Sequence, residues 1–281
     1  MEAKHKAKLR IREDEFGGIC YVPHRDDFFA LDKPSYDFLS SLNSDWQVLE
    51  KANEVPAKTL AQLGILETRK SATREKPYSG PSFIGSFEEL VTISEPLVVN
   101  CFSTSFCPMA CIYCHADDLM KIKRDQENEN ELKSVISTAS AIPSVVAVIT
   151  GGDPLSRPDR AIRLIENLSP QKALVLDTSG AGDLTQLLPA LVEHDVHVRV
   201  SLDSAVKTVN DDLRPINHKV FGRKGSSFDE ARSTIQKCLD SGISVTVQSV
   251  VTNRNENTDE LLNLRELLLA DGVRNWVLHC D

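Results

Sequence analysis

The sequence lacks long apolar runs, is poor in aromatic residues and carries no excess of positive charge. No stretch approaches the roughly 18 consecutive apolar residues of a membrane-spanning helix, and residues 1–10 are polar and basic, unlike a secretory signal. Lys and Arg number 32 against 41 Asp and Glu, a net charge of −9, which argues against nonspecific nucleic-acid binding. We therefore expect a cytoplasmic protein that binds neither a membrane nor a nucleic acid.

Cysteine is scarce and unevenly placed. The chain has 7 Cys among 281 residues, and in a reducing compartment they would not form a disulfide framework. Cys20, Cys101 and Cys238 fall in predicted strands or on the apolar face of a predicted helix, as buried thiols do. Three others are gathered within residues 107–114, and this group is where we expect chemistry.

The N-terminal part of the chain predicts a small α+β domain of winged-helix-like type over residues 1–69. It is followed by a polar stretch containing proline and glycine, which predicts an interdomain linker over residues 70–95. The predicted strands are 8–13, 19–22 and 28–31, and the predicted short helices are 34–42, 46–53 and 57–62.

Strands and helices alternate over residues 96–281. Residues 145–150 form a continuous apolar run, typical of a strand buried on both faces. Such an alternation predicts an α/β fold with parallel strands, either a doubly wound sheet or a partial TIM-like barrel, with ligands at the carboxyl ends of the strands. The predicted strands are 97–102, 145–150, 173–177, 197–202, 244–252 and 276–279; the predicted helices are 130–141, 158–168, 183–194, 227–241 and 258–270.

The cysteine group reads Cys107-Pro-Met-Ala-Cys111-Ile-Tyr-Cys114 and follows the first of these strands. Thiolates at this spacing can bind three irons of a cubane cluster and leave the fourth iron open to a ligand. One alternative is a structural zinc site, which needs a fourth ligand such as Cys101 or His115. The other alternative is three unrelated buried thiols.

The spacing CxxxCxxC, with the aromatic Tyr113 before the last cysteine, resembles the radical SAM superfamily over residues 97–279. The resemblance implies a partial (β/α)6 barrel and a [4Fe-4S] cluster held by Cys107, Cys111 and Cys114. It also implies that S-adenosylmethionine binds the open iron, with Tyr113 near its adenine, and that reductive cleavage yields a 5′-deoxyadenosyl radical. A flavodoxin- or ferredoxin-type protein would supply the electron.

Two further segments carry the same resemblance. Gly151, Gly152 and Asp153 precede a proline after the second strand, where the superfamily usually has Gly-Gly-Glu-Pro in contact with the methionine amino group. Glycines there let a ligand approach the backbone closely, although an ordinary turn would also use them. Ser201 and Asp203, at the end of the fourth strand, resemble the residues that meet the ribose and carboxylate of S-adenosylmethionine.

Three stretches of the sequence resemble one subgroup of the radical SAM superfamily. Residues 245–255 and Arg214-Pro215 resemble the members that mature peptides and molybdopterin. Residues 5–69 resemble a PqqD-like peptide-recognition domain, which implies binding of a leader peptide as an added strand; the alternative is a purely structural wing.

These resemblances predict a radical SAM enzyme that modifies a ribosomally synthesised precursor peptide. One alternative is an enzyme of the same superfamily acting on a small molecule or a partner protein. Another is a noncatalytic, metal-containing peptide-binding protein. Relatives of the peptide-maturing kind carry further cysteines in a C-terminal extension, so we expect the core to be truncated after Cys280.

Overall fold

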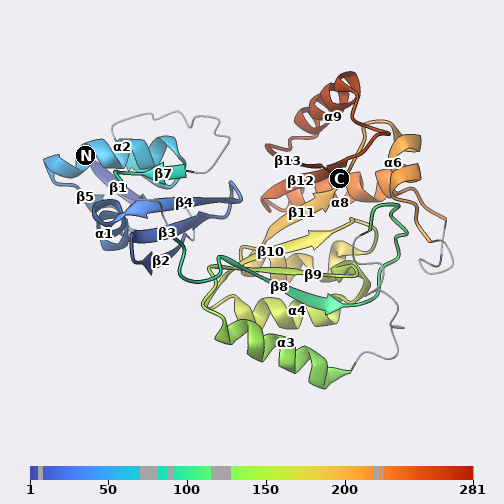
Figure 1. Ribbon diagram of the computed structural model, residues 1–281, viewed down its shortest axis with the longest axis horizontal. Helices are drawn as coiled ribbons and strands as arrows, with labels where there is room; N and C mark the ends of the chain where they lie inside the picture. The colour runs from blue at the N-terminus through green and yellow to red at the C-terminus, as the bar shows by residue number, and fades with distance from the viewer. Residues whose placement is uncertain are drawn as a thin grey trace. The chain divides into compact units, whose positions relative to one another are not determined.

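The computed structural model divides into two units, which are described separately (Figure 1). The first comprises residues 1–97 and 143–145, and the second comprises residues 98–142 and 146–281. Within them the structure describes residues 1–5, 9–69, 82–87, 92–114, 128–217, 222 and 224–280, so most of the predicted linker and His115 of the alternative zinc site lie outside the described residues. No helix among the described residues is both long and apolar enough to cross a membrane.

The first unit contains two small sheets, of strand order β2-β3-β4-β7 and β5-β1-β6. Strands β2, β3 and β4 form an antiparallel meander, and β7 joins β4 in parallel. The strands are β1 (Glu2–His5), β2 (Arg10–Asp14), β3 (Gly17–Val22), β4 (Asp27–Asp32), β5 (Gln47–Val48), β6 (Leu66–Arg69) and β7 (Ser82–Ile84); the helices are α1 (Lys33–Ser41), η1 (Lys51–Asn53) and α2 (Glu54–Gln62).

Two local predictions for this unit differ from the structure. The helix predicted over residues 46–53 is wrong, because Gln47 and Val48 pair with β1 and only a short 3-10 turn follows. Within the stretch predicted as linker, residues 82–84 form β7. Both differences arise because these residues pair with strands that are distant in sequence. The pattern of apolar and polar residues within a short segment does not predict such pairing.

Six parallel strands form the sheet of the second unit, in the order β13-β12-β11-β10-β9-β8. Each strand pairs with its neighbour along the chain, which confirms the α/β prediction and matches a partial TIM-like barrel. The strands are β8 (Val98–Thr104), β9 (Val146–Gly151), β10 (Ala173–Thr178), β11 (His197–Ser201), β12 (Val245–Val251) and β13 (Asn275–Cys280); the helices are α3 (Glu129–Ala141), η4 (Pro154–Ser156), α4 (Pro158–Leu168), η5 (Leu184–Gln186), α5 (Leu188–Glu193), α6 (Lys207–Leu213), α8 (Ser227–Asp240) and α9 (Thr258–Ala270).

Helix boundaries in this unit follow from caps and prolines. In the helix predicted over residues 183–194, Asp183 accepts a hydrogen bond from the Thr185 N–H at the start of η5, but Pro189 restricts the true α-helix to Leu188–Glu193. The N-cap of α8 is Ser226, and the hydroxyl of Ser227 donates to Asp211. Helix α6, in the connection after β11, was not predicted.

Side chains alternate along each strand, so the sheet has two faces. One is apolar, and the other, which we call the polar face, carries buried valines (Val146, Val148 and Val175) and, toward the carboxyl ends of the strands, polar side chains. Ile149, Leu176 and Val200 belong to the buried cluster that packs against the helices, together with Cys238, which confirms the prediction of a core thiol. On β10 and β11, the partly exposed Asp177 and Arg199 alternate with these buried residues. The apolar face therefore packs against the helices, and the opposite face presents its polar side chains near the carboxyl ends of the strands.

Candidate active site

The three predicted cluster ligands lie in a loop, residues 105–114, that follows β8 and that we call the cysteine loop. Residues 108–112 of this loop run antiparallel to residues 213–217, the segment that follows α6. This pairing gives the loop a defined backbone path at the carboxyl end of the sheet. The contacts are Ala110 N–H to Pro215 O at 2.8 Å, Ile112 N–H to Leu213 O at 3.1 Å, Asn217 N–H to Pro108 O at 2.8 Å, and a bridge between Met109 and Ile216.

Glycines support the other side of the cysteine loop. The Gly152 N–H donates to Thr104 O at 2.7 Å, and the Asp153 N–H donates to Phe106 O at 2.9 Å. A Cβ atom on Gly152 would lie 2.1 Å from Phe106 O, and one on Gly151 would lie 2.3 Å from Thr104 O. The two glycines thus let the turn after β9 approach the backbone of Thr104 and Phe106 closely. The sequence by itself predicts that they make room for a ligand instead.

The side chain of Asp153 is directed into the protein. It is 1% exposed and accepts hydrogen bonds from Leu155 N–H at 2.9 Å, Thr178 Oγ1 at 2.9 Å and Ser179 N–H at 2.8 Å, and also from the Ser179 hydroxyl. Burial raises the pKa of this carboxyl, and these hydrogen bonds oppose the rise. The carboxylate therefore ties the β9 turn to the end of β10.

The thiols of Cys107, Cys111 and Cys114 are half-buried and lie on one stretch of eight residues. Burial raises the pKa of Cys107, and negative charge on Asp153 and on the other two thiols raises it further. Among the described residues, no group of three or more His, Cys, Asp or Glu side chains is arranged to hold a single metal ion. A cubane has a different requirement, because each thiolate binds a different iron. Three soft donors on one short, partly exposed loop fit such a cluster.

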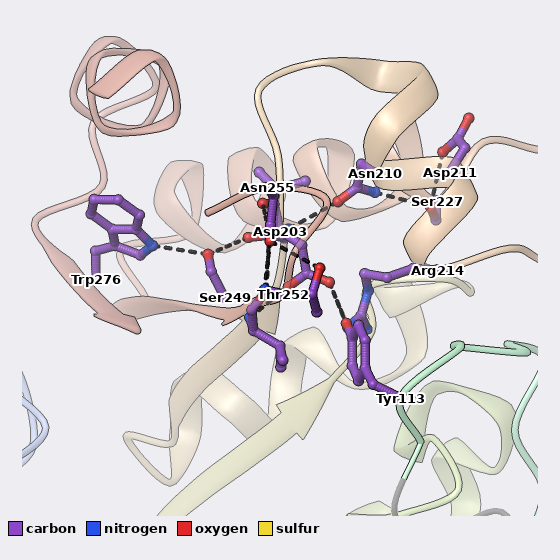
Figure 2. A network of polar contacts seen from close by, with 12 residues as sticks. Tyr113, Asp203, Asn210, Asp211, Arg214, Ser227, Ser249, Thr252, Asn255 and Trp276 are labelled. Atoms are coloured by element: carbon purple, nitrogen blue, oxygen red, sulfur yellow. Dashed lines mark hydrogen bonds and ion pairs between the residues drawn. The ribbon is translucent and has the colours of Figure 1, made fainter. Parts of the chain in front are cut away.

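Tyr113 of the cysteine loop, which is half-buried, forms a triad with the buried side chains of Asp203 and Arg214 (Figure 2). Asp203 is fully buried just after β11; its carboxylate accepts a hydrogen bond from the Tyr113 hydroxyl and lies 3.7 Å from Arg214 Nη1. Arg214 also donates to Tyr113 Oη at 2.6 Å. Burial raises the pKa of Tyr113, an effect that Arg214 opposes. Burial alone would lower the pKa of Arg214, but Cys111, Tyr113 and Asp203 outweigh it and raise that pKa.

Two asparagines that sequence reasoning missed hold Asp203 in place (Figure 2). Asn210 in α6 accepts from the Asp203 N–H at 2.9 Å, and Asn255 donates to Asp203 O at 2.8 Å. The Asp203 carboxylate also accepts from the Val250 N–H at 2.9 Å. Asn255 lies in the stretch 245–255, which resembles a subgroup of the superfamily. Asn210 could have been identified only through helix α6, which was not predicted from the sequence.

The polar face of the sheet carries a row of paired side chains. Arg199 lies opposite Asp177 in register, with 3.7 Å between Nη1 and Oδ1, and these side chains are 19% and 28% exposed. His197 Nε2 is 2.8 Å from Thr246 Oγ1. Ser201, the last residue of β11, is half-buried and shares the face of Arg199. Valines fill the part of this face away from the carboxyl ends of the strands, as branched residues usually fill barrel interiors, whereas the part nearer those ends is polar and suits a polar ligand.

A sequence profile for the radical SAM superfamily matches residues 102–268, more than half of the chain. GTP 3′,8-cyclase from Saccharophagus degradans is 29% identical over 196 residues, covering 68% of this chain and 55% of the cyclase. PqqA peptide cyclase from Ruegeria pomeroyi is 25% identical over 193 residues, covering 68% of this chain and 48% of that cyclase. The chain thus spans about half the length of these curated relatives.

Solved structures show a similar fold. The crystal structure of Streptococcus suis SuiB bound to S-adenosylmethionine superposes with a TM-score of 0.59 at 13% identity, covering 99% of this chain and 63% of SuiB. SuiB bound to the precursor peptide SuiA gives a TM-score of 0.59 at 14% identity with the same coverage, 99% and 63%. The likeness extends over both units of the chain and concerns the fold.

Proposed function

Because the chain belongs to the radical SAM superfamily of enzymes, which use a [4Fe-4S] cluster and S-adenosylmethionine, we propose that it modifies a ribosomally synthesised precursor peptide. The observation that carries the radical chemistry is the cysteine loop, held by backbone hydrogen bonds at the carboxyl end of the parallel sheet, with its Tyr113 bonded to the buried side chains of Asp203 and Arg214. Two of the relatives support a peptide substrate, namely PqqA peptide cyclase and SuiB with its precursor peptide.

In this proposal Cys107, Cys111 and Cys114 hold the cluster, which when bound would deliver the electron that cleaves S-adenosylmethionine to a 5′-deoxyadenosyl radical. The chain's own residues bind and orient the cosubstrate. Tyr113 would lie beside the adenine, and Ser201 would meet the ribose or the carboxylate. Asp203 is also expected from the sequence to contact these groups, but its carboxylate is buried and engaged by Tyr113 and Val250, so it would act by holding Tyr113 in place. The backbone of Gly151, Gly152 and Asp153 would face the methionine amino group, since the Asp153 side chain is engaged within the protein.

The proposal assigns residues 1–69 to a PqqD-like domain that holds the leader peptide, residues 70–95 to a linker and residues 96–281 to the radical SAM core. Strand addition needs an accessible strand edge. In the first unit β7 already lies on the edge of β4, but it pairs with only Phe29, Ala30 and Leu31. The other edge of this sheet is β2. A leader strand would therefore add beside β2 or replace β7, since a longer strand can pair with more of β4.

A small-molecule substrate is the second candidate. The similarity to GTP 3′,8-cyclase favours it, and the polar face around Asp177 and Arg199 suits a charged small molecule as well as a peptide side chain. In either case a flavodoxin- or ferredoxin-type protein would be the electron donor.

The proposal is tested by anaerobic reconstitution with iron and sulfide, followed by dithionite and S-adenosylmethionine, with and without the co-encoded precursor peptide. We expect 5′-deoxyadenosine release that the peptide stimulates, and a mass change in the peptide. Cys111→Ala should lose the cluster and the release, whereas the exposed control Cys280→Ala should keep both. A full cubane spectrum from Cys111→Ala would refute the ligand assignment, and stimulation by a nucleotide in place of the peptide would select the second candidate.

A further inference from the structure

The antiparallel pairing of the cysteine loop brings one cluster ligand opposite a buried cation. Residues 110 and 112 donate to residues 215 and 213, so in this register Cys111 faces Arg214. Residues directly opposite in such a pair have their Cβ atoms about 4.5–5.5 Å apart and on the same side. The position of Arg214 relative to Cys111 is therefore set by backbone hydrogen bonds.

The charge of Arg214 is held in a fixed orientation. The residue is 6% exposed, its Nη1 donates to the Tyr113 hydroxyl at 2.6 Å, and the Asp203 carboxylate lies 3.7 Å away. Asp203 is itself held by the N–H of Val250 and by Asn210. Because Cys111 lies opposite Arg214 in the antiparallel register, the positive member of the Arg214–Asp203 pair is the one that faces the thiol.

We propose that Arg214 is a positioning residue that sets the reduction potential of the cluster held by Cys107, Cys111 and Cys114. Uptake of one electron from an external reductant adds one negative charge at the loop. A fixed cation in a poorly solvated site stabilises that charge far more than it would in water, and net charge near a cluster is one determinant of its potential. This inference rests on the cluster part of the proposed function and is independent of the substrate.

The test is a redox titration of the reconstituted protein monitored by electron paramagnetic resonance, with dithionite as reductant and without S-adenosylmethionine. Iron and sulfide are measured first, so that each variant is compared at equal cluster content. Arg214→Gln should lower the midpoint potential, with about a tenfold loss in the preference for the reduced form, which corresponds to about 59 mV for one electron. Arg214→Lys should stay near the wild-type midpoint, because it keeps the charge.

Arg232→Gln is the matched control, since Arg232 pairs with Asp271 at 2.6 Å and its side chain is 38% exposed; its midpoint should not move. Asp203→Asn removes the opposing negative charge and should raise the midpoint potential. If Arg214→Gln assembles no cluster, this second variant tests whether the charges of the pair set that potential. An unchanged midpoint in fully loaded Arg214→Gln, or an unchanged or lowered one in Asp203→Asn, would overturn the inference. A failure of the precursor peptide to react would leave these potentials unaffected, so the two proposals fail separately.

Discussion

The carboxylate of Asp203 accepts a hydrogen bond from the Tyr113 hydroxyl and lies 3.7 Å from the guanidinium of Arg214. These three residues come from the loop after β11, the cysteine loop and the segment after α6 (Figure 2). One buried carboxylate therefore ties together three segments that are far apart in sequence. The conformation of the cysteine loop depends on this contact as well as on its own backbone.

Asp203→Asn should destabilise the second unit by about 3 kcal/mol, because removing one partner leaves the buried Arg214 charge uncompensated. The measurement is urea unfolding followed by Trp276 fluorescence in a Trp46→Phe background, which confines the signal to this unit. Asp271→Asn breaks the more exposed pair with Arg232 and should cost about 1 kcal/mol or less. Equal effects of the two changes would contradict the assignment of Asp203 as a buried counter-charge.

Gly152→Ala should displace the cysteine loop and lower the iron content after reconstitution. The added Cβ would lie 2.1 Å from Phe106 O, a backbone atom with little freedom to move, and such overpacking costs about 1–3 kcal/mol or more. Gly242→Ala is the control, since a Cβ there meets open space. It should cost about 1–2 kcal/mol through its positive φ alone and leave the iron content unchanged; an equal loss of iron in both variants would argue against the steric explanation.

Arg199→Gln should reduce substrate-stimulated turnover at least about tenfold, because it removes one half of the charged pair on the polar face of the sheet. The expected loss corresponds to one charge-assisted hydrogen bond between Arg199 and the substrate, which is worth about 1.5–3 kcal/mol. Release of 5′-deoxyadenosine without substrate should stay at the wild-type rate, since the proposal gives Arg199 no contact with S-adenosylmethionine. Arg265→Gln, on the exposed side of α9, is the matched control. A parallel fall in both rates would indicate a structural role for Arg199.

The stability of the first unit should fall in acid through Asp32. Burial acts to raise the pKa of this carboxyl, but hydrogen bonds from Ser35 and Ser86 outweigh it and lower the pKa. A carboxyl whose pKa is lower in the folded state stabilises the protein above its unfolded value of about 3.9, and that contribution is lost as the pH falls through the folded value.

Urea unfolding followed by Trp46 fluorescence, in a Trp276→Phe background, should show this loss between about pH 5 and pH 2. Asp32→Asn should flatten that pH dependence, because an amide does not titrate. An unchanged slope would show that other carboxyl groups account for the acid sensitivity.

Much of the second unit followed from local patterns. A continuous apolar run marked the strand around Ile149, and strand order followed chain order because each helical connection returned the chain to the neighbouring position. The N-terminal unit was harder, since β5 and β7 are two- and three-residue strands. Strands this short carry no periodicity and exist only through their pairing with β1 and β4.

The sequence by itself determined the chemistry of the site: three thiols at a fixed spacing, an aromatic residue before the last one, and glycines after the second strand. Those features are local, because they depend on a few consecutive residues. Only the tertiary structure decided that Gly152 packs on Phe106, that Asp153 points inward and that Arg214 faces Cys111. Each of these depends on backbone segments distant in sequence meeting at the end of the sheet, where sterics and burial, rather than residue type, assign the role.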